Sequence, residues 1–309
     1  GFNKSHAVSY AIDSYYCAWL MTYYEEEWLC GYLEAMSGNP KKRAKAFSEI
    51  KKLGYKVSPI DINYATKSWT ILEGRKFMPS FLSCKGVGEA AIDEIITNRP
   101  YESLNDLLWE DTGKWKHSKF NKRALENLIK IKAFDSMGVV GDGGPFESYK
   151  HMHEILIGNN ANIKKWTKKD PDRGKNAYKE SLLESGVCAE WTRKELAQHS
   201  IDLLGSFNAS SLMSQELQDR LDEKGVRPID DHTGLDLYWF VVMDVKAKLT
   251  KNKRPYLLIT AAGLGGNVRM FCWGWDGETD LPLYSICVAE VDQNDFGHST
   301  KMHKLRVLS

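Results

Sequence analysis

The spacing of apolar residues divides the chain into a helical part and a strand-rich part. Up to about residue 220, apolar positions recur every three or four residues, which is the period of an α-helix. From Leu237 onward they alternate with polar positions, which is the period of a β-strand. We therefore expect a multidomain protein whose N-terminal two-thirds are mainly α and whose C-terminus is all-β.

Stop signals divide the helical part into separate helices. The sequence Ser37-Gly38-Asn39-Pro40 ends one helix, and Gly54 ends the next. Trp69–Phe77, with Gly74 between two β-prone pieces, predicts a small hairpin. Helices are predicted over residues 5–24, 25–36, 41–53, 89–97, 104–109 and 121–130.

The C-terminal part has short strands separated by turns. Strands are predicted over residues 239–245, 256–260, 268–273 and 284–289. Short strands at this spacing predict a small barrel, and we expect an OB-fold. Phe271 and Trp273 share one face of their strand, but the pattern leaves open whether that face is the core.

Two loop-rich stretches divide these elements into domains. Gly141–Pro145 is the clearest linker, and Lys224–Gly234 marks a second boundary. The domains expected from these boundaries are residues 1–77, a helix-hairpin-helix domain at 78–138, a helical linker region at 139–234 and the barrel at 235–309.

Composition restricts the classes of function. The formal net charge is +1, so a face that binds nucleic acid has to be a local basic patch. The six cysteines form no C-x-x-C pair, which argues against zinc and against a disulfide framework. No apolar run reaches the length of about 18 residues that a membrane span needs. We expect no bound metal or cofactor in this chain.

The most informative motif is Lys85-Gly86-Val87-Gly88, directly before a predicted helix. Two glycines one residue apart permit a backbone turn that side chains would block. The first N–H groups of the following helix have no partner within the helix, and they can hold a DNA phosphate without reading a base. An ordinary tight turn between two helices fits the motif as well.

Basic residues are concentrated after this motif. Between Lys114 and Lys132, Glu126 is the one acidic residue. Lys122 and Arg123 are candidate phosphate contacts; the alternative is a merely solvated face. The basic residues of this stretch are Lys114, Lys116, Lys119, Lys122, Arg123, Lys130 and Lys132.

The barrel carries a second candidate site. Its first predicted turn, Lys246–Pro255, is basic, and aromatic residues follow on the adjoining strands. OB-folds hold single-stranded nucleic acid by charge and by stacking of bases on aromatic rings. The candidates are Lys248, Lys251, Lys253, Arg254, Tyr256, Phe271 and Trp273.

Several segments, in order along the chain, are similar to one protein family. The opening Gly1–Ala11 resembles the G-F-N-K-S-H-A-x-x-Y-A segment in the fingers of bacterial family C replicative DNA polymerases, the DNA polymerase III alpha subunits. The other matching segments are Ser58–Asn63 (P-x-D-I-N), Lys85–Ala91 (K-G-V-G-E-A-A), Asn121–Lys130, Ala133–Ser136 and Glu195–Gly205. The resemblance covers essentially the whole chain; it is strong to about residue 138 and loose beyond.

The resemblance implies different roles for different parts of the chain. Residues 1–77 would be distal fingers, 78–138 would bind duplex DNA, and the barrel would bind the single-stranded template. The carboxylates that hold Mg²⁺ would belong to a palm domain upstream of Gly1, so this segment alone is expected to be inactive. Asp61 matches a structural segment, and Asp170 and Asp172 lie in a basic polar region; we assign none of them to metal.

The resemblance also implies partners. Lys4 and His6 lie in the fingers motif and are candidate contacts to the incoming dNTP; the alternative is that Asn3, Ser5 and His6 cap the following helix. Duplex and single-stranded DNA and the palm and thumb of the polymerase are the other expected partners. Whether a sliding clamp is also a partner is left open by the sequence, because it contains no convincing clamp-binding peptide of the Gln-x-x-Leu-Phe type. We expect that the chain does not bind a membrane and that it is located in the cytoplasm of a bacterial or infected bacterial cell.

Two other hypotheses are alternatives to the hypothesis that this chain is a portion of a replicative polymerase. One is a separate, non-catalytic DNA-binding subunit, and the other is an unrelated helical protein with a tRNA-type OB module. Met78–Cys84 replaces the glycine-rich approach that is usual in the family, and such drift is typical of a viral or otherwise divergent polymerase.

Overall fold

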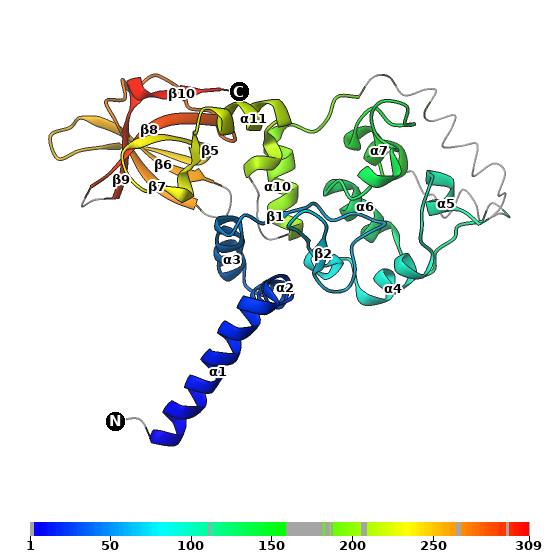
Figure 1. Ribbon diagram of the computed structural model, residues 1–309. Coiled ribbons are helices and arrows are strands. Elements are labelled where there is room, and N and C mark those ends of the chain that lie inside the picture. Colours follow the sequence, from blue (N-terminus) through cyan, green and yellow to red (C-terminus); the bar gives the residue numbers. More distant parts are fainter. Residues whose placement is uncertain are drawn as a thin grey trace. The chain divides into compact units, whose positions relative to one another are not determined.

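The computed structural model divides into two compact units, Gly1–Glu190 and Trp191–Ser309 (Figure 1). It describes residues 3–110, 112, 114–158, 182, 186, 188–204, 209–263, 267–294 and 297–308. Asp170 and Asp172 lie outside the described residues. The finer domain boundaries expected from the sequence stay predictions.

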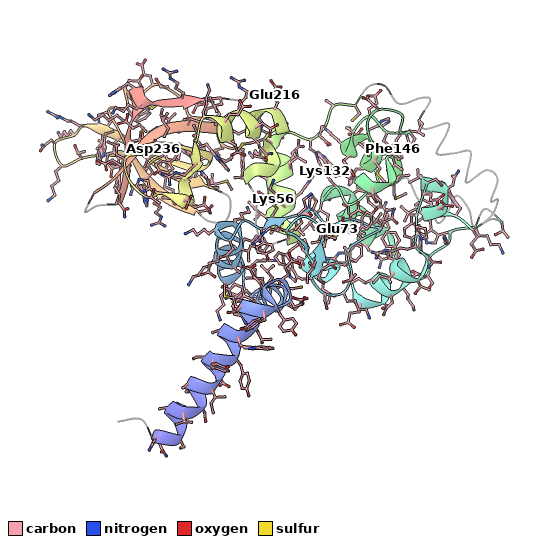
Figure 2. The ribbon with its side chains drawn as sticks, in the orientation of Figure 1. Lys56, Glu73, Lys132, Phe146, Glu216 and Asp236 are labelled. Carbon is pink, nitrogen blue, oxygen red and sulfur yellow. The ribbon has the colours of Figure 1, made fainter. Side chains whose placement is uncertain are left out.

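The first unit begins with the helices α1 (Lys4–Tyr23), α2 (Glu25–Met36) and α3 (Pro40–Lys52). Leu29 and Leu33 of α2 pack against Ile50 of α3, and Trp69 and Phe77 complete this core. By contrast, none of the side chains of α1 is buried, and Figure 2 shows them projecting around the helix. The predicted helices are therefore present, although α1 has an apolar surface without a core.

A small sheet follows these helices. The strands β1 (Lys56–Val57), β2 (Thr70–Leu72) and β3 (Lys76–Met78) pair in the order β1-β3-β2. The antiparallel pair β2–β3 is the hairpin predicted around Gly74, whose φ of +75° lies in the left-handed region.

The elements described in the rest of the first unit are short helices whose apolar side chains are mostly buried. These are η1 (Phe81–Ser83), α4 (Glu89–Thr97), α5 (Leu104–Leu108), α6 (Lys122–Lys130), η2 (Asp135–Met137) and α7 (Tyr149–Leu156). The apolar faces of α4 and α6 are buried, through Ile92 and Ile95 on the first and Leu125 and Leu128 on the second. Asp61 is structural, because its carboxylate accepts hydrogen bonds from Asn63 N (2.9 Å) and from both the N and Oγ of Ser136 (3.0 and 2.7 Å).

The second unit combines helices with a barrel. The helical elements are α10 (Arg193–Leu204), η3 (Ala209–Leu212), α11 (Gln215–Glu223), η4 (Ile229–Asp231) and η5 (Met302–Lys304). The strands are β4 (Arg227–Pro228), β5 (Asp236–Leu249), β6 (Pro255–Ala262), β7 (Asn267–Trp273), β8 (Ile286–Asn294), β9 (Gly297–Lys301) and β10 (Leu305–Val307).

The barrel closes because β5 pairs with both of its flanking partners. The order is β5-β6-β7-β9-β8, and β8 returns to β5; β7 and β9 are parallel and the other pairs are antiparallel. This is the OB-fold expected from the sequence. Tyr238, Phe240 and Val242 of β5 fill the barrel, whereas Trp239 and Val241 on the opposite face pack with residues of η3 and α11.

The barrel also corrects two expectations. First, β5 continues to Leu249, so Lys248 lies on a strand and the turn is confined to residues 250–254. Second, the periodicity did not predict β9 and β10. The sequence of β9, Gly-His-Ser-Thr-Lys, has no apolar alternation, and pairing with β7 and β8 alone makes it a strand.

Candidate nucleic-acid interface

The Gly-Val-Gly motif forms a tight exposed turn that leads into α4. Gly86 has a φ of +86°, a conformation that L side chains rarely adopt. The turn is closed by Val87 N, which donates to Cys84 O at 3.2 Å, and the Val87 side chain is buried. Lys85, Gly86 and Gly88 remain exposed. The structure thus anchors the turn by its valine and presents its glycines to solvent.

The N-terminus of α4 differs from those of its neighbours. Gly88 is the N-cap of α4, and no side chain accepts its first N–H groups. The caps of α5, α6 and α7 do accept such bonds, through Ser103, Asn121 and Ser148. In the described part of the chain, the N–H groups of Gly86 and Gly88 have no acceptor. These donors and the positive end of the helix dipole form a site suited to an anion.

Helix α6 brings Arg123 to this turn. A Cβ placed on Gly86 would lie 3.2 Å from Arg123 Nε and 2.6 Å from Asn127 Nδ2. Asn127 itself donates from Nδ2 to Lys85 O at 2.7 Å. Gly86 and Arg123, both predicted from the sequence, are therefore neighbours. Asn127 was missed, although a polar residue among the apolar positions of α6 is the signal that could have found it.

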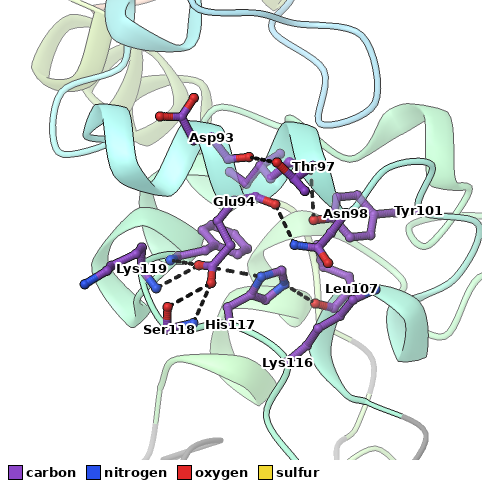
Figure 3. Close-up of polar contacts among 12 residues, drawn as sticks. Asp93, Glu94, Thr97, Asn98, Tyr101, Leu107, Lys116, His117, Ser118 and Lys119 are labelled. Atoms are coloured by element: carbon purple, nitrogen blue, oxygen red, sulfur yellow. Dashed lines mark hydrogen bonds and ion pairs between the residues drawn. The ribbon is translucent and has the colours of Figure 1, made fainter.

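Glu94 of α4 contacts the loop that precedes α6 (Figure 3). Its carboxylate accepts hydrogen bonds from the backbone N–H groups of Ser118 and Lys119, both at 2.7 Å, and from that of Phe120 at 2.5 Å. Burial alone would raise the pKa of Glu94, but these backbone donors outweigh it and lower the pKa to about 2. Glu94 is thus ionised at neutral pH and fixes the loop that precedes α6.

A buried histidine lies beside Glu94 without donating a hydrogen bond to it. His117 Nδ1 lies 3.8 Å from a carboxylate oxygen of Glu94, and its Nε2 lies 2.5 Å from Leu107 O. Burial lowers the pKa of His117 below its ordinary value, so the ring is neutral at pH 7. The hydrogen bond to the Leu107 carbonyl then requires the proton on Nε2.

The basic stretch after the motif is less available than its composition indicates. Lys116 Nζ donates to Asp106 O and Lys122 Nζ to Ile157 O, each at 2.9 Å. Lys130 pairs with Glu126 at 2.6 Å, and Lys132 pairs with Glu190 at 3.1 Å. Among the described residues, four basic side chains stay exposed with neither a carboxylate nor a carbonyl partner: Lys85, Lys114, Lys119 and Arg123. Lys122 remains a predicted contact, but its ammonium is already engaged.

The second candidate surface is the outer face of the barrel. Met270 and Cys272 of β7 are buried in the core, so Phe271 and Trp273 point outward, which settles the face that the sequence left open. These two rings are stacked, with centroids 5.5 Å apart and an interplanar angle of 4°. Tyr256, opposite Trp273 across the β6–β7 pair, lies 4.9 Å from its ring. The three predicted aromatic residues therefore form one platform.

Basic residues flank this aromatic platform of Tyr256, Phe271 and Trp273. Lys248 lies opposite Tyr256 in the β5–β6 register, and Arg269 precedes Phe271 on the same face of β7. Arg269 was not predicted, and its place two residues before Phe271 in an alternating strand is the signal for it. The other predicted residues, Lys251, Lys253 and Arg254, are exposed in the β5–β6 turn.

The remaining predicted residues lie at the start of α1. Lys4 and His6 are exposed, and Asn3 caps the helix by accepting from Ser5 N at 3.4 Å. The His6 ring contacts the Tyr10 ring one turn later, at 4.5 Å. The helix-capping alternative thus holds for Asn3, and contact of Lys4 and His6 with nucleotide stays a prediction.

The described residues contain no group of three or more His, Cys, Asp or Glu side chains able to hold a metal ion. Among the helices described, none combines the length and the apolar character that crossing a bilayer requires.

Comparison with known proteins agrees with this geometry. The helix-hairpin-helix motif family matches residues 54–140, the region of α4 to α6. The DNA polymerase III alpha subunit of Campylobacter jejuni is 32% identical over 215 residues, which are 66% of this chain and 17% of that protein. The resemblance to DNA polymerase III alpha subunits is confirmed. The alpha subunit of Escherichia coli K12 is 33% identical over 138 residues, which are 45% of this chain and 12% of that protein.

The match to the alpha subunits is partial on their side. The chain spans less than a fifth of the length of these two relatives. Among solved structures, the second OB-fold domain of replication protein A from Methanococcus maripaludis covers 27% of this chain and 94% of its own, with 13% identity and a TM-score of 0.21. The barrel is therefore assigned from its own strand order.

Proposed function

We propose that this chain is the part of a replicative DNA polymerase that holds primer-template DNA and handles the incoming nucleotide. The turn at Gly86 and the N-terminus of α4 would hold the phosphate backbone of the duplex, with Arg123 and Lys85 supplying charge. The barrel platform would hold the single-stranded template. The observation that carries this proposal is the uncapped, exposed N-terminus of α4 beside Arg123.

We propose that the catalytic step, addition of the nucleotide to the primer, takes place in another domain of such a polymerase. Carboxylates of a palm domain would hold Mg²⁺ for attack of the primer 3′-OH on the nucleotide. Lys4 and His6 are proposed to meet the triphosphate or sugar of that nucleotide. Given dNTPs and Mg²⁺, this chain alone is then expected to bind primer-template without extending the primer, as a gel-based extension assay would show.

The test is duplex binding by the full chain at several salt concentrations. Neutralisation of about four to six phosphates gives a log–log slope of roughly −4 to −5. An affinity that does not change with salt would exclude phosphate contacts and overturn the proposal.

A glycine variant locates the contact. Gly88 has extended backbone (φ −88°, ψ 161°) and nothing within 4 Å of an added Cβ. Gly88→Val should therefore fold normally while its side chain covers the amides of α4, and we expect duplex affinity to fall about tenfold, the loss of one hydrogen bond to a charged group.

The matched control is Gly31→Val. Gly31 lies on α2 and also has nothing within 4 Å of an added Cβ. Its variant is expected to bind duplex DNA as the wild type does. Equal affinity of Gly88→Val and wild type would remove the turn from the interface.

A further inference from the structure

The helix-hairpin-helix region has two halves: the Gly86 turn with α4, and the loop before α6 with α6 itself. Each half donates or accepts hydrogen bonds that hold the backbone of the other. Helix α6 supplies Asn127 to the turn before α4, and helix α4 supplies Glu94 to the loop before α6. Each contact joins a side chain of one half to the backbone of the other half. The bonded residues are 42 and 24 positions apart in the chain, so the contacts belong to the tertiary structure.

The Asn127 contact determines where the Gly86 N–H points. Asn127 Nδ2 donates to the carbonyl of Lys85, and that carbonyl belongs to the same peptide unit as the Gly86 N–H. In a planar trans peptide the C=O and N–H point in opposite directions. Holding the carbonyl toward α6 therefore turns the Gly86 N–H away from α6, at an exposed position.

The same contact explains the close approach of the backbone. Asn127 is 8% exposed, and its buried amide needs a hydrogen-bond partner. The approach leaves no room for a Cβ on Gly86, and Arg123, one turn before Asn127 on α6, lies beside the same position. One side chain thus sets the direction of a backbone donor and its distance from an arginine.

We infer that Asn127 is a positioning residue for phosphate binding by the Gly86 turn. It does not touch the DNA; it presents the Gly86 N–H and the Arg123 guanidinium to one phosphate. This inference rests on the proposed function, because it assumes that the turn binds duplex DNA. It goes beyond that proposal by naming the residue that makes the turn competent.

The test is Asn127→Asp in the full chain. Aspartate has nearly the shape of asparagine, but an ionised carboxylate has no N–H for the Lys85 carbonyl and repels it. We expect duplex affinity to fall about tenfold, and the log–log salt slope to become less steep by about 0.9, the value of one lost phosphate contact. Unfolding of a fraction of the protein would lower the amount of active protein without changing the slope.

Asn127→Ser and Ser148→Ala complete the design. Serine is a smaller residue that can still donate, so Asn127→Ser should retain more of the salt slope than Asn127→Asp. Ser148→Ala removes the side-chain cap of α7, a buried polar contact away from the turn, and should leave the slope unchanged. In amide exchange, DNA should protect Gly86 in the wild type and fail to do so in Asn127→Asp.

The possible results separate this inference from the proposed function. If the wild type shows no salt-dependent duplex binding, the proposed function fails. If the wild type binds as proposed but Asn127→Asp has the same slope and the same protection of Gly86, the positioning role of Asn127 is wrong and the proposed function stands.

Discussion

At the scale of single residues, the helix-hairpin-helix region depends on partly buried polar groups that hold its backbone in place. Glu94 is an example, because three backbone N–H groups converge on one carboxylate. Its ordinary pKa of 4.5 is lowered to about 2 in the folded protein. The contact is therefore fully stabilising above about pH 4.5, and its contribution is lost as the pH falls toward 2.

Glu94→Gln tests this contribution. Glutamine keeps one acceptor oxygen but loses the charge, so the free energy of unfolding at pH 7 should fall by about 1–3 kcal/mol. The difference between wild type and variant should shrink between pH 4.5 and pH 2, where the wild-type carboxylate becomes protonated. Urea unfolding at several pH values measures both effects.

The control for this prediction is Glu89→Gln, which changes an exposed carboxylate in the first turn of the same helix. It should have little effect on stability. A wild-type advantage over Glu94→Gln that stays constant from pH 7 to pH 2 would show that the charge of Glu94 does not matter.

At the scale of elements, strand β7 carries core residues on one face and the proposed binding residues on the other. Its alternate residues have opposite surroundings, with Met270 and Cys272 in the core and Phe271 and Trp273 outside. Substitutions at adjacent positions of one strand should therefore have different consequences.

Trp273→Ala is expected to weaken binding of single-stranded oligo-dT by about 1–3 kcal/mol, the contribution of one base stacked on an aromatic ring. The thermal stability of the barrel should change little. Fluorescence anisotropy and thermal melting measure the two quantities.

Met270→Ala, on the core face of the same strand, should have the opposite effect to Trp273→Ala. It should lower the free energy of unfolding by about 2–5 kcal/mol because it leaves a cavity in the core. The folded fraction should keep its affinity for oligo-dT. Unchanged oligo-dT affinity in Trp273→Ala would exclude the platform as the single-strand site.

At the scale of the whole molecule, the chain consists of two units with separate cores. The two apolar clusters of the barrel unit contain residues from Ala209 to Leu305, with Leu196 packed against them, and all of these belong to Trp191–Ser309. Among the described residues, no apolar residue of Gly1–Glu190 takes part in these clusters.

We therefore expect residues 191–309, produced alone, to fold. Thermal melting should show one cooperative transition, near-ultraviolet circular dichroism should show fixed aromatic packing, and oligo-dT affinity should match that of the full chain. A molten or aggregated product would show that the barrel needs the first unit.

The sequence by itself determined the periodic elements, the glycine turn and the relationship to the polymerase subunits. The helix period, the stop at Gly54 and the alternation in β7 depend on neighbours within a few residues, so they are visible in the chain. The exposed Gly86 turn and the aromatic residues of the barrel were predicted for the same reason.

Only the tertiary structure decided which groups meet. The side chain of Asn127 is hydrogen-bonded to Lys85, 42 positions away in the chain. Lys132 forms an ion pair with Glu190, at a still larger separation in the sequence. Such contacts form when the chain closes around its core, and no local pattern encodes them. For this reason the sequence indicated where basic residues are numerous, whereas the fold determined that Arg123 faces the turn, that Lys122 is engaged, and that Phe271 and Trp273 face outward.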